Sequence, residues 1–304
     1  MKIKTYIDYI TFSPEIRTSA TGLADALDCV KSHDQVTRWL TQSHFCPNDL
    51  WSEVEDKVDL KKGKLVLDDT VVPKPHSSLE NSDLVQYYHQ SEGFVKGINV
   101  VQMLWVDGEK VIPIDFRIVE KDSGISKNDI AQEMLKTAYQ RGFRGIHVLF
   151  DSWYGANETL RLIVKLGFNY TTRFKKNRRG IVNGINVKIA TIVSQSAKIV
   201  TIPGVGDVKV FVTDPDIILA TSLLKSTRKQ TLQRYRVRWR IEEFFRAAKQ
   251  VYRLGGCQAR NSNAWQTHIY ASILAYARNA LAGVNHYQIK RLAQQQMLGG
   301  YLAA

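Results

Sequence analysis

The stretch "YRVRWRIEEFFRAAK", residues 235–249, has helical spacing on two opposite sides. Because a helix advances about 100° per residue, side chains three, four and seven positions apart fall on one narrow stripe. That stripe is polar and holds Tyr235, Arg238, Glu242 and Lys249. The opposite side is apolar and holds Val237, Ile241, Phe244, Ala248 and Val251. The pattern predicts a helix with one buried face and, on the other face, one acid between cations.

The charge of the chain favours a polyanionic partner. The 304 residues include 42 Lys and Arg against 29 Asp and Glu, which gives a net charge of +13. An excess of this kind favours nucleic acid or an anionic membrane surface. No apolar run approaches the roughly 18 residues of a membrane-spanning helix, and the first residues do not resemble a signal peptide. We therefore expect a nucleic-acid partner, no membrane, and a cytoplasmic, nucleoid-associated protein.

The cysteines indicate neither a disulfide framework nor a metal centre. Cys29, Cys46 and Cys257 are few and scattered, and no C-x-x-C occurs. The spacing of the first two relative to His33 and His44 fits none of the usual zinc patterns. We expect ordinary thiols.

Residues 19–43 predict two short helices. Apolar residues keep helical spacing up to Val30, and Ser32 is placed to cap a second helix that begins near Asp34. Two interpretations stay open. The pair is a helix-turn-helix whose second helix enters the major groove of DNA, or it is a small bundle packed on the main domain.

The rest of the chain indicates an alternation of strands and helices. Asp107-Gly108, in the middle of a Val- and Ile-rich run, is a strong hairpin signal. The expected strands are 65–67, the two arms of a hairpin in 95–120, 145–151 and 168–174, followed by β-rich residues 175–221. The expected helices are 126–142, 156–166, 235–249 and 262–284. A three-strand meander followed by strand–helix alternation implies a mixed α/β sheet flanked by helices.

Acidic residues stand at comparable places in this order. Asp68 and Asp69 end the first strand, Asp151 ends the fourth, and Glu242 lies on the helix after the β-rich segment. A right-handed crossover can bring the first and fourth strands together, and neighbouring strand ends form the usual active-site edge of an open sheet. An acid at a strand end can also be a turn residue or a helix cap, as Asp151 is placed to be.

Converging carboxylates of this kind favour a metal site. They repel each other, and divalent ions remove that cost. Oxygen ligands without cysteine or histidine suit Mg²⁺ or Mn²⁺, and two such ions clamp the attacking and departing oxygens of a phosphodiester. Glu242 is the candidate on its helix, since Glu243 sits about 100° away from the polar stripe. The sequence therefore suggests phosphoryl transfer on DNA or RNA.

The spacing Y-x2-R-x3-E-x6-K, which residues 235–249 match at every defined position, resembles the signature of bacterial insertion-sequence transposases of the DDE type. The segments "LVLDDT" and "VLFDSWY" look like the first and second aspartate regions of that family. The resemblance covers roughly residues 60–285, and the four-residue signature is its specific part. It implies a ribonuclease H-like core and cut-and-paste transposition, in which cleavage at the element ends precedes attack of the freed 3′-hydroxyl on target DNA.

The resemblance also implies roles for individual residues. Asp151 and Glu242 are expected as the second and third acids, which hold two Mg²⁺ or Mn²⁺ ions. The first acid is Asp69 or Asp68. Because a strand alternates its faces, only one of this pair can face the metals, and Asp69 is favoured. Contacts to the DNA backbone near the cut are expected from Tyr235, Arg238 and Lys249.

A division of the chain and a set of partners follow from the same resemblance. The expected parts are an N-terminal helical DNA-binding region at 1–60, a catalytic core at 61–174 and 222–285, a β-rich insertion at 175–221, and a C-terminal tail at 286–304. The expected partners are double-stranded DNA, as terminal inverted repeats of the element and as target, and further copies of the same chain on that DNA.

The sequence departs from the family pattern in two places. The second aspartate region usually carries a small residue shortly after the acid, whereas "SWY" follows Asp151 here. Some relatives stack a flipped base on a tryptophan of the β-rich insertion, but residues 175–221 contain none. Either another residue, with Phe211 as the candidate, takes that place or no such platform exists, and the hairpin step therefore stays open. Two alternative functions stay open: a nuclease of the same core that cuts without joining, and a non-catalytic DNA-binding protein derived from a transposase.

Overall fold

The computed structural model describes residues 1–12, 18–79, 82–90, 93–193, 196–214 and 217–302. The helices are α1 (Ile3–Phe12), α2 (Ala20–Ala26), α3 (His33–Gln42), α4 (Pro47–Val54), η1 (Glu55–Lys57), α5 (Lys127–Gln140), η2 (Ser152–Tyr154), α6 (Asn157–Lys165), α7 (Ile189–Ile192), α8 (Arg228–Arg236), α9 (Trp239–Gln250), α10 (Ser262–Leu281) and α11 (His286–Leu302). The strands are β1 (Lys64–Pro73), β2 (Gln86–Gln90), β3 (Gly93–Asp107), β4 (Lys110–Ile118), β5 (His147–Phe150), β6 (Asn169–Phe174), β7 (Arg179–Val182), β8 (Ile185–Lys188), β9 (Lys198–Ile202), β10 (Gly206–Asp214) and β11 (Ile217–Thr221). None of the helices in these ranges is long and apolar enough to cross a membrane.

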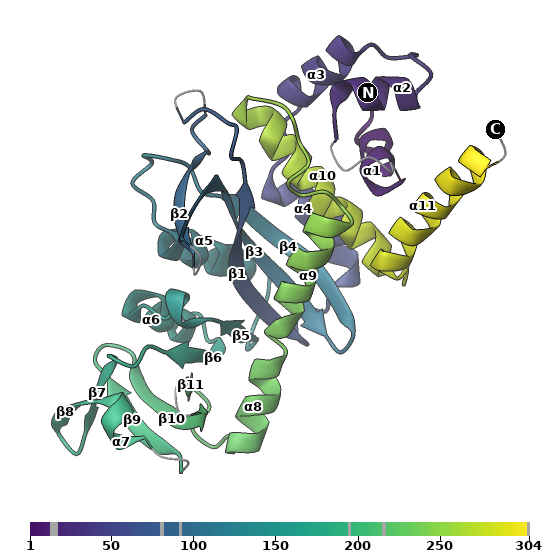
Figure 1. Ribbon diagram of the computed structural model, residues 1–304. Coiled ribbons are helices and arrows are strands. Elements are labelled where there is room, and N and C mark those ends of the chain that lie inside the picture. The colour runs from purple at the N-terminus through teal and green to yellow at the C-terminus, as the bar shows by residue number, and fades with distance from the viewer. Residues whose placement is uncertain (13–17, 80–81, 91–92, 194–195, 215–216, 303–304) are drawn as a thin grey trace.

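The strands form one mixed sheet (Figure 1). Its order is β2-β3-β1-β5-β6-β11-β10-β9-β7-β8, with β4 beside β3. β3 and β4 form the hairpin predicted around Asp107, and β1 is antiparallel to β3. β5 and β6 then join in parallel to β1. The predicted fold class is confirmed: a meander followed by parallel strands, with β1 next to β5 as the crossover argument requires.

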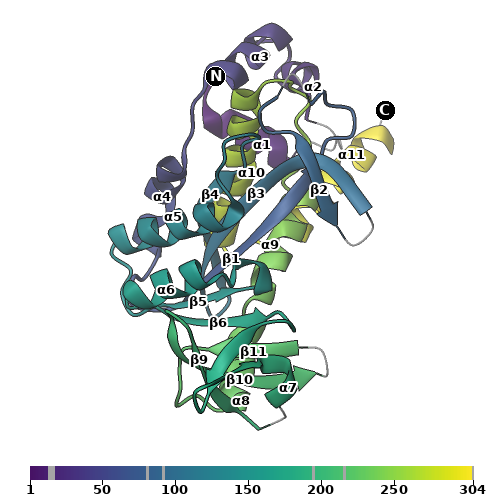
Figure 2. The same cartoon turned by 90° about the vertical axis from the view of Figure 1, so that its left-hand side faces the viewer.

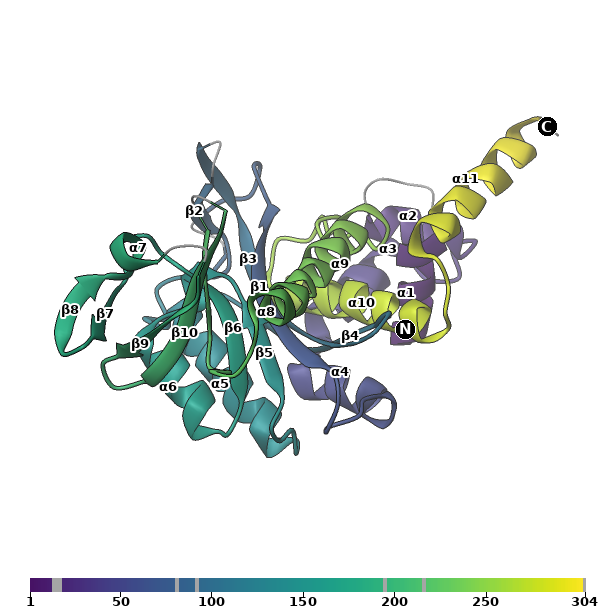
Figure 3. The same cartoon turned by 90° about the horizontal axis from the view of Figure 1, so that it is seen from below.

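Helices cover both faces of the sheet. Seen from below, α5 and α6 lie on one side of the central strands, and α9 and α10 lie on the other (Figure 3). The apolar side of α9 is buried as its spacing predicted, since Ile241, Phe244 and Ala248 are hardly accessible to solvent. Burying a side chain of this size stabilises the fold by about 1.5–3 kcal/mol. This packing fixes α9 against β1.

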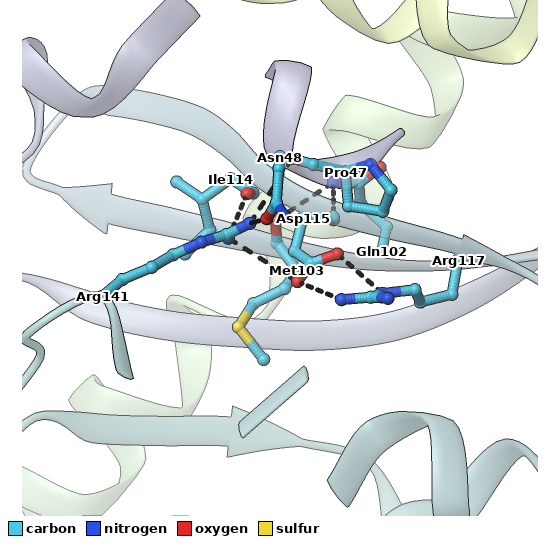
Figure 4. A network of polar contacts seen from close by, with 8 residues as sticks. All are labelled: Pro47, Asn48, Gln102, Met103, Ile114, Asp115, Arg117 and Arg141. Carbon is cyan, nitrogen blue, oxygen red and sulfur yellow. Dashed lines mark hydrogen bonds and ion pairs between the residues drawn. The ribbon is translucent and has the colours of Figure 1, made fainter. Parts of the chain in front are cut away.

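A buried ion-pair network ties α4 and α5 to strand β4 (Figure 4). Arg141, just after α5, donates to the carbonyl of Ile114 at 2.8 Å and to Asn48 Oδ1 at 3.1 Å. Asp115 lies 3.6 Å from the same guanidinium and accepts from Arg117 Nε at 3.0 Å. Burial raises the pKa of Asp115, and the two arginines oppose that shift. The network fixes both helices to the end of the sheet that is remote from β7–β11.

The N-terminal helices α1, α2 and α3 gather at one end of α10 (Figure 2). Tyr6 Oη and His268 Nδ1 are 2.8 Å apart, which joins α1 to α10. Ser32 caps α3 as the sequence predicted, in a capping box with Gln35. The buried side of α3 holds Val36 and Leu40. The helix pair therefore packs on the main body and still leaves one polar side of α3 exposed.

Several elements differ from the sequence-based expectation. β2 lies in a segment for which no element was predicted, and α11 forms in the segment expected as a tail. α1 and α4 lie in the N-terminal region expected to be helical, although their bounds were not predicted. The expectation of one helix over 235–249 is wrong, because α8 ends at Arg236 and α9 begins at Trp239. Between them, Val237 N bonds to Arg234 O and Arg238 N to Tyr235 O, which is the tighter three-residue spacing of a 3-10 turn.

Candidate active site

Strands β1 and β5 bring two acids to the same level. Their parallel register pairs Val66 with Leu149, and continuing it by two residues puts Asp68 level with Asp151. Burial, and next the negative charge of Asp151, raise the pKa of Asp68 to about 7. A shift of this kind is what converging carboxylates should show, and it is typical of functional sites.

Arg238 links the third acid to the first. Its Nη1 donates to Asp68 Oδ2 at 2.8 Å, and its Nη2 donates to Glu242 in a short contact. The side chain of Arg238 is only 12% exposed, so its guanidinium is committed to the two acids. Glu243 has a different partner, since it accepts from Arg240 at 3.0 Å. Glu242, and not its neighbour, is therefore connected to Asp68.

Asp69 has a full set of partners from other elements. Lys127 Nζ lies 3.0 and 2.9 Å from its two oxygens. Asn99 Nδ2 donates to Oδ2 at 2.6 Å, and Tyr154 Oη donates to Oδ1 at 2.6 Å. Each oxygen of Asp69 thus accepts two hydrogen bonds, which uses the capacity of a carboxylate. Asp68 and Asp69, adjacent in sequence, have different partners because strand alternation directs them to different sides.

Asp151 precedes the short helix η2 and caps it. Its Oδ1 accepts from Trp153 N at 2.8 Å, so the capping role considered for this acid is present. That bond engages one of its two carboxylate oxygens. The Trp153 side chain is 52% exposed, and Lys127 and Lys175 place their Nζ atoms 4.7 and 5.3 Å from its ring centre. The surface next to Asp151 therefore carries an aromatic ring and two cations.

The two remaining residues of the signature lie in unlike surroundings. Tyr235, at the end of α8, is 8% exposed and packs with Phe211 and Leu219, and burial raises its pKa to about 12. Within the described chain its hydroxyl has no hydrogen-bond partner. Lys249, near the end of α9, is exposed. Phe211 is completely buried, so the expectation that it stacks a flipped base is wrong.

The three acids offer the oxygen donors that Mg²⁺ and Mn²⁺ prefer. As the side chains stand, no group of three carboxylates, histidines or cysteines among the described residues could hold a metal ion. Arg238 lies between Asp68 and Glu242 and is shared by both, so its single positive charge does not compensate the two carboxylates fully. A divalent ion bound to these acids would replace this guanidinium as the counter-charge. The donor chemistry fits such an exchange, because an ion with a higher charge compensates Asp68 and Asp151 together.

Three residues next to the acids were not predicted from the sequence. Asn99, Lys127 and Tyr154 reach Asp69 from 30, 58 and 85 residues away. Contacts this remote produce no periodicity, so the only available signal was the departure of "SWY" from the family pattern. The cysteines are free thiols, as expected: Cys29, Cys46 and Cys257.

Comparison with known proteins adds to this geometry. Residues 59–278 match the sequence model of a family described as "Transposase DDE domain". The fold is similar to that of the piggyBac transposase in a synaptic complex with hairpin DNA, with a TM-score of 0.57 and 10% identity over 96% of this chain and 69% of that chain. The NurA nuclease from Sulfolobus solfataricus aligns over 91% of this chain and 96% of its own at 11% identity, but a TM-score of 0.27 supports no argument. No curated protein matches the sequence.

Proposed function

This chain belongs to the transposase DDE domain family, and we propose that it cleaves DNA at the ends of an insertion sequence and transfers the freed strand into target DNA. The matched residues, 59–278, include every acid of the candidate site. Enzymes of this family act on DNA, and the net charge of +13 suits that substrate.

The acids in this proposal are Asp68, Asp151 and Glu242, which would hold two Mg²⁺ or Mn²⁺ ions. The observation that carries the assignment is the Arg238 bridge, in which one guanidinium serves both Asp68 and Glu242. Asp151 joins them because the strand register puts it level with Asp68. Asp69, which the sequence alone favoured as the first acid, is the weaker candidate, since three other side chains engage both of its oxygens.

The chain's own residues then bind and orient the DNA. When bound, the ions would stabilise the attacking and leaving oxygens at phosphorus, both in cleavage and in strand transfer. Arg238, once released from the acids, suits a phosphate as well as it suits a carboxylate. Lys249 is exposed and free to neutralise a nearby phosphate. Tyr235 acts through its ring, 5.8 Å from the Arg238 guanidinium, because its hydroxyl is buried.

The proposal keeps the division of the chain that the sequence predicted. Residues 1–60 would recognise the element ends. The core would be formed by residues 61–174 and 222–285, and the insertion by residues 175–221. Residues 1–60 contain 6 Lys and Arg against 10 Asp and Glu, so their overall charge does not attract DNA, and binding would depend on individual side chains. Alanine at the exposed Arg38 and Gln42 of α3 should lower affinity for element ends and spare non-specific DNA. If the variants prefer element ends over non-specific DNA as strongly as wild type does, α3 only packs on α10.

Self-association on DNA is a further part of the proposal. It is supported by the similar piggyBac structure, which is a synaptic complex. Transposition also needs two ends to be joined to one target. Light scattering of the chain with and without a DNA end measures the stoichiometry. A single chain per DNA complex at saturation would refute this part.

A two-step assay tests the reaction itself. DNA carrying the inverted repeats that flank the reading frame is first tested for nicking in Mg²⁺ by wild type and Asp68→Asn. A pre-cut end with a free 3′-hydroxyl is then tested for joining to target DNA. Nicking without joining indicates the nuclease alternative, and specific binding without either step indicates the non-catalytic one.

A further inference from the structure

Three side chains from three other elements contact Asp69 of β1: Asn99 of β3, Lys127 of α5 and Tyr154 of η2. These four residues are termed the Asp69 cluster. Asp69 directly follows Asp68, and Tyr154 stands three residues after Asp151. The 2.6 Å hydrogen bond from Tyr154 Oη to Asp69 Oδ1 therefore joins the two segments that carry these acids.

Backbone pairing does not make this connection. The ladder between β1 and β5 is described as far as Val66 and Leu149, two residues short of each acid. Beyond that point, the carbonyl of Asp151 accepts from Thr172 Oγ1 at 3.0 Å, which holds it to β6 on its other side. That contact does not set the distance from Asp151 to Asp68. The side-chain bond of the Asp69 cluster is placed to do so.

We propose that Asp69 and Tyr154 are positioning residues, which set the separation of Asp68 and Asp151 and thereby the affinity of this acid pair for divalent ions. The inference rests on the proposed assignment of Asp68 and Asp151 as metal ligands. Two carboxylates repel, so the loop after β5 tends to carry Asp151 away from Asp68. A hydroxyl that donates to an ionised carboxylate opposes this, because such a bond is about twice as strong as one between neutral groups.

The charges and protons of the cluster suit the role. Lys127 contacts both oxygens of Asp69, so a positive charge lies beside the carboxylate that accepts the hydrogen bond of Tyr154. Tyr154 is completely buried. Its burial, and next the charges of Asp69, Asp68 and Asp151, raise the pKa of Tyr154 well above its ordinary value. The hydroxyl therefore keeps the proton that it donates.

The cluster could instead serve only the stability of the fold. Positioning and stability differ in what the loss of one hydroxyl changes. If the bond only adds stability, its loss lowers the melting temperature and leaves metal affinity alone. If the bond sets the separation of the acids, its loss weakens metal binding even where the protein remains folded. Loss of a group that orients a metal ligand typically costs about ten- to a hundredfold in affinity.

Tyr154→Phe is the decisive variant, because it removes one hydroxyl and leaves Asp69 with Lys127 and Asn99. Tyr170→Phe is the matched control, since Tyr170 of β6 is equally buried and its hydroxyl has no hydrogen-bond partner among the described side chains and backbone. Binding of MnCl₂ to the full chain without DNA is followed by electron paramagnetic resonance. Tyr154→Phe should weaken Mn²⁺ binding about tenfold, and Tyr170→Phe should stay within about twofold.

Two further variants separate this inference from the assignment beneath it. Asp68→Asn should lose more than about a hundredfold in Mn²⁺ affinity, as expected for a lost ligand. Asp69→Asn keeps an acceptor for Tyr154 and should lose less. If Asp68→Asn weakens binding while Tyr154→Phe does not, or if Tyr170→Phe weakens it equally, the positioning role fails alone. If Asp69→Asn abolishes binding and Asp68→Asn does not, the assignment of the acids fails instead.

Discussion

The two sides of strand β1 carry adjacent acids in opposite conditions. Asp69 is paired with a lysine and receives further hydrogen bonds from an amide and a hydroxyl. Asp68 shares one guanidinium with Glu242 and faces the charge of Asp151, and burial and this charge raise its pKa to about 7. On the Asp69 side of the strand, the negative charge has its own cation beside it. The other side holds more negative charge than its own cation compensates.

This difference indicates how a metal-binding carboxylate would be told from one that is already paired. An acid whose oxygens are all satisfied gains little from a metal ion, because binding would cost it its existing partners. An acid that is buried near another acid lacks a full counter-charge, and a metal ion that binds there supplies it. The comparison therefore predicts that substitutions on the Asp68 side remove chemistry, whereas substitutions on the Asp69 side weaken it.

The largest contrast is expected between Asp68→Asn and Asp69→Asn. Loss of a metal ligand removes several kcal/mol of transition-state stabilisation, and about 1.4 kcal/mol corresponds to a factor of ten in rate. Single-turnover nicking should therefore fall by about a thousandfold or more in Asp68→Asn, and by about ten- to a hundredfold in Asp69→Asn. The sequence alone favoured the reverse order. A dead Asp69→Asn beside an active Asp68→Asn would restore that first assignment.

Glu242→Gln and Glu243→Gln extend the contrast to α9. Glu242 shares Arg238 with Asp68, whereas Glu243 pairs with Arg240. The amide keeps the size of the side chain and removes the charge that holds metal. Nicking should fall by about 10²–10³ in Glu242→Gln and change less than threefold in Glu243→Gln, while DNA binding measured by gel shift stays nearly intact in both. Equal nicking by the two variants would place the third acid elsewhere.

The sequence predicted the parts of this site that depend on short-range spacing. Helical periodicity singled out Glu242, and the meander with its crossover placed β1 beside β5, so Asp68 or Asp69 had to approach Asp151. Periodicity could not choose between adjacent acids, because that choice depends on Lys127 and Tyr154, which are remote in sequence.

Spacing also failed where a 3-10 turn separates two helices. The stripe assumed one straight helix, but Tyr235 sits at the end of α8 and packs with Phe211 and Leu219 of the β-rich segment. α9 packs on β1 instead, so the chain tightens between the two helices. Tertiary contacts decided the burial of Tyr235, and the local pattern does not contain them.

Arg238→Ala and Lys249→Ala should separate two kinds of cation near the acids. Removing Arg238 frees Asp68 and Glu242, so Mn²⁺ should bind more tightly to the DNA-free protein, while nicking falls by about a hundredfold because the scissile phosphate loses its anchor. Removing Lys249 should leave Mn²⁺ affinity unchanged and reduce the salt dependence of DNA binding by about one phosphate contact.

Lys165→Ala is the control for this pair, since Lys165 is exposed at the end of α6, a different helix. It removes one positive charge on a different helix from Glu242 and should affect neither Mn²⁺ affinity nor nicking at saturating protein. If Arg238→Ala binds Mn²⁺ no better than wild type, the guanidinium does not compete with the metal, and Arg238 is only a DNA contact.

The smallest effect expected is a pH dependence of metal affinity. Asp68 must lose its proton to bind an ion, and burial together with the charge of Asp151 raises its pKa to about 7. Below that pH the ion competes with a proton, so Mn²⁺ affinity should fall about tenfold from pH 8 to pH 6.

Two variants test the origin of this transition. Arg238 lowers the pKa of Asp68, so Arg238→Ala should move the midpoint of the transition to higher pH. The charge of Asp69 raises the pKa of Asp68 less than burial and Asp151 do, so Asp69→Asn should move the transition only slightly to lower pH, although it lowers affinity at every pH. Titration of the DNA-free protein with MnCl₂ at several pH values measures all three. A flat profile between pH 6 and pH 8 in wild type would mean that Asp68 is already ionised there, and that the two sides of β1 do not differ in the way that their partners indicate.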